Sequence, residues 1–247
     1  SHHHELTELF RWAKGSVETI QGDGNAAHCI LQHAERLDVD LIVVGARGHS
    51  AIGRILLGSV SDTVATHAKC SVLVVRTDDE QVSQLDQPLK ITLAYDGSAS
   101  STEAAAELKH FRWPEDTSVT ALAVVPSSSF FAPGHSVVIQ NQIENEADRA
   151  RQRVDALIGS LSATIANIDA QLAHGDHVGD AIIQSADESG SQLIVLGDTG
   201  HGLLSELILG STTKYVLRHA SCSVWISRHH RQSIPATQTS QSAKFAF

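Results

Sequence analysis

DLIVVGARGHSAIGRILLGS, residues 40–59, returns later in the chain as QLIVLGDTGHGLLSELILGS, residues 192–211. The offset between the two stretches is 152 residues, and the same offset relates Cys70 to Cys222. In each copy an apolar run ends at a glycine, and a later Gly-Ser pair opens a stretch with the apolar spacing of a helix. A repeat of this length indicates two copies of one supersecondary plan.

The rest of the second copy continues this plan. Apolar runs typical of buried parallel strands span 89–95, 119–125, 165–172, 192–196 and 223–227, with helical patterns between them. Ser100 and Glu103 have the spacing of a capping box at the start of an alanine-rich helix. Strands that alternate with helices predict a parallel α/β sheet that is covered on both faces.

The repeat also divides the chain. We expect a first half over 1–77, a polar linker over 78–88, a second half over 89–228 and a polar tail over 229–247. At the offset of 152, the strand at 89–95 has no counterpart, because its counterpart would precede residue 1. The first half is therefore predicted to lack its first strand, first helix and second strand.

Composition narrows the classes of partner. The net charge of −10 argues against nucleic acid, because binding to a phosphate backbone usually needs a basic surface. No apolar run of about 18 residues predicts a membrane span. Three cysteines without a CxxC pair predict neither a disulfide framework nor a metal site and suit the cytoplasm. A small anionic ligand stays compatible with the charge, because backbone amides can hold phosphate.

The glycine motif is the main candidate for such a ligand site. The first glycine of each copy ends a strand, which is where open α/β sheets bind ligands. The later Gly-Ser pair opens a helix, whose free N–H groups and dipole favour an anion. The alternative is purely structural, with glycines that allow close packing and serines that cap helices. The motif consists of Gly45, Gly48, Gly58 and Ser59 in the first copy and Gly197, Gly200, Gly210 and Ser211 in the second.

The spacing Gly-2x-Gly-9x-Gly-Ser, present twice, resembles the ATP-binding members of the universal stress protein family, in a tandem arrangement. The resemblance implies an adenine nucleotide α-hydrolase-like fold in each half, an open doubly wound parallel sheet of order 3-2-1-4-5. It implies ATP as the ligand and a regulatory role in the stress response. The nucleotide-binding residues that it implies are Asp96 and Val124 for adenine, and Gly197, Thr199, Gly200, Gly210, Ser211 and Thr212 for ribose and phosphates. From the residues alone, Asp96 also fits a simple turn.

The first copy is expected to hold only a second, weaker phosphate site. The adenine-binding residues of the second copy have no counterpart in the first copy, although Arg47 could attract an anion. That site would consist of Gly45, Arg47, Gly48, Gly58 and Ser59. In the second copy, Asp198 lies within the motif, and an acidic side chain beside a phosphate needs either a bridging Mg²⁺ or an orientation away from it. No residue is assigned a catalytic role, and His49 and His201 are interpreted as solvated loop residues.

Two other functions stay open at this point. One is a slow ATPase or autophosphorylating enzyme that uses Ser211 or Thr212 as the acceptor, although no base or transition-state arginine stands at a recognisable spacing. The other is a structural protein that associates through its last strands, residues 70–75 and 222–226. This association would join the two halves or build a homodimer. The leading interpretation is a regulatory ATP-binding protein.

Overall fold

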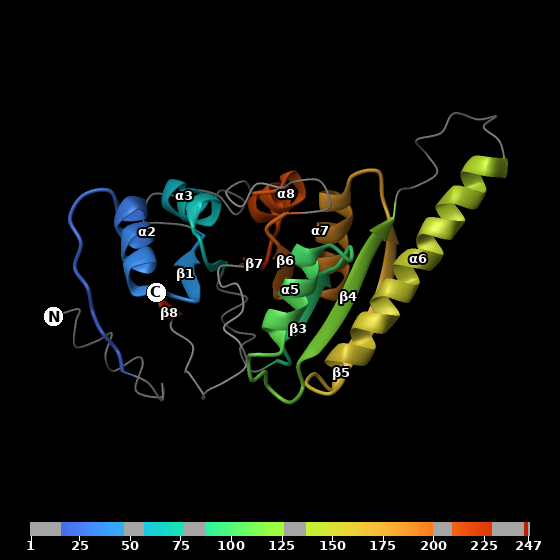
Figure 1. Cartoon of the computed structure of the whole chain (residues 1–247), viewed down its shortest axis with the longest axis horizontal. Helices are drawn as coiled ribbons and strands as arrows, with labels where there is room; N and C mark the ends of the chain where they lie inside the picture. Colours follow the sequence, from blue (N-terminus) through green and yellow to red (C-terminus); the bar gives the residue numbers. More distant parts are fainter. Residues whose placement is uncertain are drawn as a thin grey trace.

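The computed structural model describes residues 16–46, 57–76, 87–125, 137–199, 209–228 and 245–246. Within these ranges the strands form one eight-stranded sheet in the order β5-β4-β3-β6-β7-β2-β1-β8 (Figure 1). Strands β3 to β7 belong to the second half of the chain, and β1 and β2 belong to the first half. The two halves therefore lie side by side along a single sheet.

The second half has the predicted alternation of strands and helices. Its five strands are all parallel to their neighbours within the half. In chain order they occupy the positions 3-2-1-4-5, which confirms the predicted doubly wound topology. The elements are β3 (Lys90–Ala94), α5 (Ala99–Leu108), β4 (Ser118–Val125), α6 (Val137–Leu161), β5 (Asn167–His174), α7 (Val178–Ser189), β6 (Leu193–Gly197), α8 (Ser211–His219) and β7 (Ser223–Ser227).

Two local predictions in this half are wrong. The strand expected at 165–172 is β5 at Asn167–His174, because Ile165 still donates its backbone N–H to Leu161 at the end of α6. The cap of α5 is Ser98, whose hydroxyl accepts from the N–H of Ser101 at 3.2 Å. Ser100 therefore makes no capping box, and its hydroxyl is used elsewhere.

The first half contributes α2 (Ala26–Leu37), β1 (Leu41–Gly45), α3 (Ser59–His67) and β2 (Ser71–Val75). The side chain of Asn25 caps the start of α2 by accepting from the N–H of His28. Residues 16–23 precede α2 as β5 precedes α7, yet they form no strand. β5 is paired with β4, and among the described residues of the first half no strand takes the place of β4 beside this segment.

The halves join through their last strands. β2 and β7 pair antiparallel, with Leu73 opposite Trp225 at the centre of the register. Residues on one face of this seam, such as Val74 and Val224, belong to a core shared with α2, α3, α7 and α8. Trp225 points to the other face and packs in the core beneath α5 and α6. The alternation of strand side chains thus gives the sheet two cores, and each core contains residues of both halves.

Part of the predicted linker and tail lies outside the described residues, namely 78–86, 229–244 and 247. Within the predicted tail, β8 (Phe245–Ala246) pairs parallel with β1. None of the helices in the described ranges combines the length and the apolar composition that crossing a bilayer requires.

Candidate nucleotide site

A cavity of about 260 Å³ opens at the carboxyl ends of β3, β4 and β6 in the second half. This is the edge of an open α/β sheet at which ligands bind, beside the point where the strand order reverses. Seven of the eight residues implied for this half line the cavity, and Gly200 lies outside the described residues. These seven are Asp96, Val124, Gly197, Thr199, Gly210, Ser211 and Thr212.

Asp96 follows β3 at the mouth of this cavity. One of its carboxylate oxygens accepts from the backbone N–H of Ser98 at 2.9 Å, which forms the turn into α5. Gly97, between them, has a φ of 81°, a left-handed conformation that favours glycine. The turn and the ligand interpretations are therefore compatible, because the turn places the Asp96 carboxylate at the cavity.

The backbone of Val124 is positioned by the different lengths of β3 and β4. Leu122 accepts from the N–H of Tyr95, so its carbonyl faces β3, whereas Val125 accepts from Gly175 on the β5 side. Because the backbone groups of a strand alternate between its two neighbours, those of Val124 face the β3 side. β3 ends at Ala94, so these groups face the cavity beyond its end.

Gly197 is required by packing. A Cβ at this position would lie 2.2 Å from the hydroxyl oxygen of Ser100 and 2.7 Å from the Ser100 backbone carbon. The sequence leaves two roles open for this glycine, close packing and the admission of a phosphate. The structure adds that it lets the first turn of α5 approach the end of β6, which brings the Asp96 turn close to the glycine motif.

The first turn of α8 forms one wall of the cavity. Gly210 is its N-cap residue and makes no side-chain cap, so neither Ser211 nor Thr212 caps the helix. Thr213 donates its hydroxyl to the Gly197 carbonyl at 2.8 Å, which fixes the helix start against β6. A helix N-terminus without a side-chain cap presents free N–H groups and the positive end of the helix dipole.

The first copy of the motif repeats this backbone geometry. Gly58 donates to Ala46 at 2.8 Å, as Gly210 donates to Asp198 at 2.7 Å. Ser61 donates to Gly45 at 2.6 Å and so takes the place of Thr213. Of the weaker site implied here, Gly45, Gly58 and Ser59 are described, and Arg47 and Gly48 lie outside the described residues.

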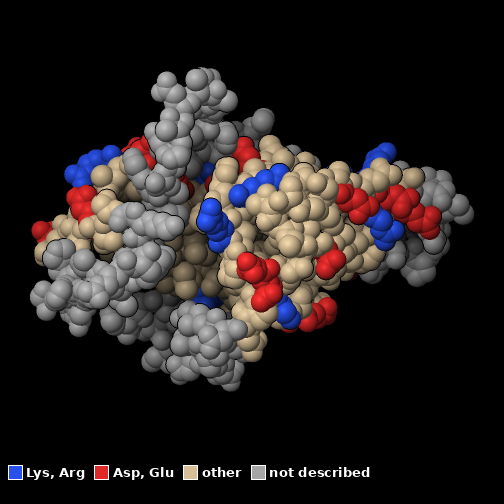
Figure 2. Space-filling view, turned by 90° about the horizontal axis from the view of Figure 1, so that it is seen from below, with Lys and Arg blue, Asp and Glu red and all other residues tan. Residues whose placement is uncertain are grey.

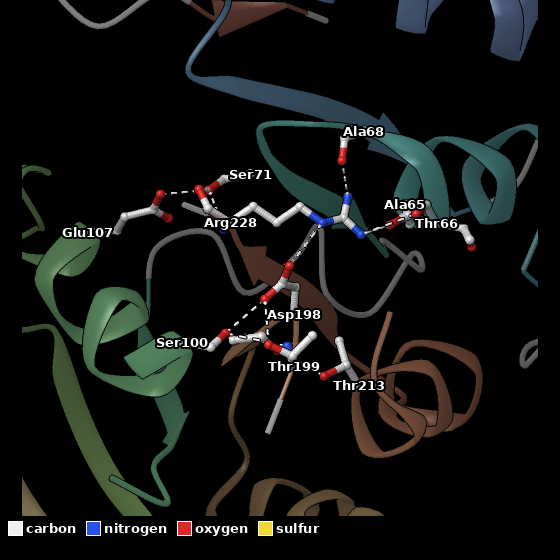
Figure 3. A network of polar contacts seen from close by, with 11 residues as sticks. Ala65, Thr66, Ala68, Ser71, Ser100, Glu107, Asp198, Thr199, Thr213 and Arg228 are labelled. Atoms are coloured by element: carbon white, nitrogen blue, oxygen red, sulfur yellow. Dashed lines mark hydrogen bonds and ion pairs between the residues drawn. The ribbon is translucent and has the colours of Figure 1, made fainter. Parts of the chain in front are cut away.

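Asp198 does not turn its carboxylate into the cavity. One oxygen accepts from the Ser100 hydroxyl at 2.9 Å, and the other lies 3.6 Å from Nε of Arg228 (Figure 3). Of the two alternatives open for this residue, the structure has the carboxylate oriented away. Asp198 therefore gives no reason to place a bridging Mg²⁺ beside the phosphates.

Sequence reasoning missed two groups of residues at the site. Leu122, Val178 and Ile182 add an apolar wall to the cavity. Their spacing on β4 and α7 is the ordinary spacing of core residues, so the pattern gave no signal. Arg228 was also missed, although it stands 152 residues after Arg76 and so continues the repeat.

The two repeated cysteines are unreactive by their surroundings. Cys70 and Cys222 are both buried and both free. Burial raises the pKa of each thiol to about 11. A thiol with such a pKa is almost entirely protonated at neutral pH, so these residues act as small core side chains.

Together the sheet order and the cavity define a tandem doubly wound α/β protein with the adenine nucleotide α-hydrolase-like fold. The chain belongs to the universal stress protein family, whose sequence profile matches residues 1–76 and 89–228.

The relatives agree with this assignment. Over 60 residues the chain is 51% identical to the universal stress protein YxiE of Bacillus subtilis, covering 24% of this chain and 40% of that protein. Over 188 residues it is 25% identical to a universal stress protein of Mycolicibacterium smegmatis, covering 76% and 61%. A universal stress protein structure from Archaeoglobus fulgidus has a TM-score of 0.58 at 23% identity, covering 91% and 74%. The chain spans about half the length of the curated relatives it matches.

Proposed function

We propose that this protein binds ATP in the cavity of its second half and acts as a regulatory protein of the stress response. The observation that carries the proposal is the convergence of three elements on one cavity. These are the Asp96 turn that follows β3, the backbone of Val124 on β4, which faces the cavity beyond the end of β3, and the start of α8 at Gly210. The regulatory role rests on the resemblance to the family.

The chemistry of the cavity suits the two ends of an adenine nucleotide. At the base end, the Asp96 carboxylate accepts from the exocyclic amine, and the backbone of Val124 offers a donor and an acceptor. Leu122 and Ile182 provide apolar surface against the ring. At the other end, the N–H groups and hydroxyls of Ser211 and Thr212 donate to phosphate oxygens. No divalent ion is needed to offset Asp198.

Isothermal calorimetry with ATP and GTP tests the site. Asp96→Ala should weaken ATP binding about tenfold or more, because a hydrogen bond to a charged group contributes about 1.5–3 kcal/mol, and should leave GTP binding nearly unchanged. Asp116→Ala is the matched control, because Asp116 is exposed in a turn and does not line the cavity. An Asp96→Ala protein that keeps the full preference for ATP would contradict the proposed base site.

Nucleotide stoichiometry tests the assignment to one half. We expect one ATP per chain in native mass spectrometry, because the proposed base site uses Asp96 and Val124 of the second half. Two ATP molecules per chain would show that the phosphate part of the first copy is sufficient.

The proposed partners follow from charge and strand pairing. In the face shown in Figure 2, the described basic side chains lie among acidic ones, which fits a protein that does not bind nucleic acid. β2 and β7 each have a strand on both sides, so a homodimer would need another surface. The free cysteines fit a cytoplasmic protein.

A further inference from the structure

Arg228 closes the end of a helix that belongs to the other half of the chain. It follows β7 in the second half, and its guanidinium donates to the carbonyls of Ala65 at 2.6 Å and Ala68 at 2.7 Å. These carbonyls lie at the end of α3, where a helix has no partners of its own for them. A cation there is also favoured by the helix dipole. Arg228 is only 6% exposed, so this contact lies inside the junction of the halves.

The same guanidinium also reaches the motif that forms the cavity. Its Nε pairs with the Asp198 carboxylate (Figure 3). Asp198 is tied into the cavity wall through its carbonyl, which accepts from the N–H of Gly210 at the start of α8. The next residue, Thr199, lines the cavity. One side chain therefore contacts both the cavity wall and the first half.

The equivalent contact in the opposite direction has no counterpart of Asp198 in the sequence. Arg76 donates to the carbonyl of Leu217 at 2.6 Å, at the end of α8, so each half closes a helix of the other. The position that corresponds to Asp198 at the offset of 152 is Ala46. Helix closure by an arginine is thus common to both sides of the junction, whereas the Asp198 carboxylate belongs to the second copy and is replaced by the Ala46 methyl group in the first.

We propose that the Asp198–Arg228 pair couples the nucleotide cavity to the anchoring of α3 in the first half. A ligand that fixes Thr199 and Gly210 fixes Asp198, and through Arg228 it holds the end of α3 more firmly. Arg228 also offsets the negative charge of the Asp198 carboxylate, so this charge repels a nearby phosphate less. Coupling of this kind is reciprocal, so firmer anchoring of α3 favours the bound state. The ligand part of this inference rests on the proposed function, and the ligand-free part does not.

Hydrogen exchange of the whole chain, measured by mass spectrometry over residues 59–75 with and without saturating ATP, tests the coupling. In Asp198→Asn without ligand, the last amides of α3 should exchange about tenfold faster, because Arg228 loses a buried charged partner. ATP should slow the exchange of these amides in the unmodified protein. In Asp198→Asn, most of this slowing should be absent. Asp62→Asn is the control, because it breaks the exposed Arg218–Asp62 pair between α8 and α3, and it should change exchange less than twofold.

The outcomes separate this inference from the proposed function. Unchanged exchange of α3 in Asp198→Asn would overturn the coupling, and so would an ATP effect that survives in that variant. If calorimetry shows ATP binding while α3 ignores ATP in the unmodified protein, the coupling fails and the proposed function stands. If ATP does not bind but Asp198→Asn loosens α3, the link stands and the proposed function fails. Should Asp198→Asn not fold, the effect of ATP on exchange of α3 in the unmodified protein decides, and its absence despite ATP binding overturns the coupling.

Discussion

The close approach of α5 to the end of β6 makes Gly197→Ala a severe substitution for its size. The added Cβ would lie 2.2 Å from Oγ, 2.8 Å from Cβ and 2.7 Å from the backbone carbon of Ser100. Rotation of the Ser100 side chain can relieve only the first of these contacts. The backbone of α5 must therefore shift, and overpacking of this kind typically costs about 1–3 kcal/mol.

Thermal unfolding measures this cost directly. For a protein of this size a loss of about 2 kcal/mol lowers Tm by about 4–8 °C. Gly159→Ala is the matched control, because a Cβ at Gly159 meets nothing within 4 Å and the residue is exposed inside α6. It should raise stability by up to about 1 kcal/mol through helix propensity. A Gly197→Ala protein that melts at or above the temperature of the unmodified protein would refute the packing argument.

Two further predictions concern other residues of the fold. Ser98→Ala should lower the free energy of unfolding by about 1 kcal/mol in urea denaturation, because it removes the N-cap of α5. The control Ser160→Ala removes no cap and should lower the free energy of unfolding by less. The thiols of Cys70 and Cys222 have a pKa of about 11 against an ordinary value of 9.0, so their contribution to stability is complete below pH 9 and is lost as the pH rises from 9 to 11. Urea midpoints measured from pH 8 to 11 should fall more for the unmodified protein than for a Cys70→Ala, Cys222→Ala double variant, and equal slopes would contradict the role of these thiols.

The fold could be predicted to a large extent because its signals are local and repeated. Apolar runs such as that ending at Gly197 identify buried parallel strands, and the repeat shows that both halves share one plan. The start of β5 could not be placed, because Ile165 is buried in the turn after α6 and therefore looks like a strand residue. The sequence predicts Ser100 as the cap of α5 because Glu103 follows it at the spacing of a capping box, and only the backbone shows that the helix begins after Ser98.

The candidate site was predictable where glycine and serine spacing carries it. The convergence of Asp96 and Val124 on one cavity depended on the resemblance, because nothing in the spacing of those residues relates them. The apolar wall and the orientation of Asp198 could not be predicted. Both depend on which residues of distant segments face each other, as Arg228 and Asp198 do across β6 and β7.

The arginines that join the two halves reach the partner helix through its main-chain carbonyls. A carbonyl is present whatever side chain its residue carries, so this contact places almost no demand on the sequence of the helix that receives it. The two receiving helices illustrate the freedom: SVSDTVATH in α3 and STTKYVLRH in α8 share only their first serine, central valine and final histidine. Each copy could therefore diverge in its own helix while the junction between them stayed the same.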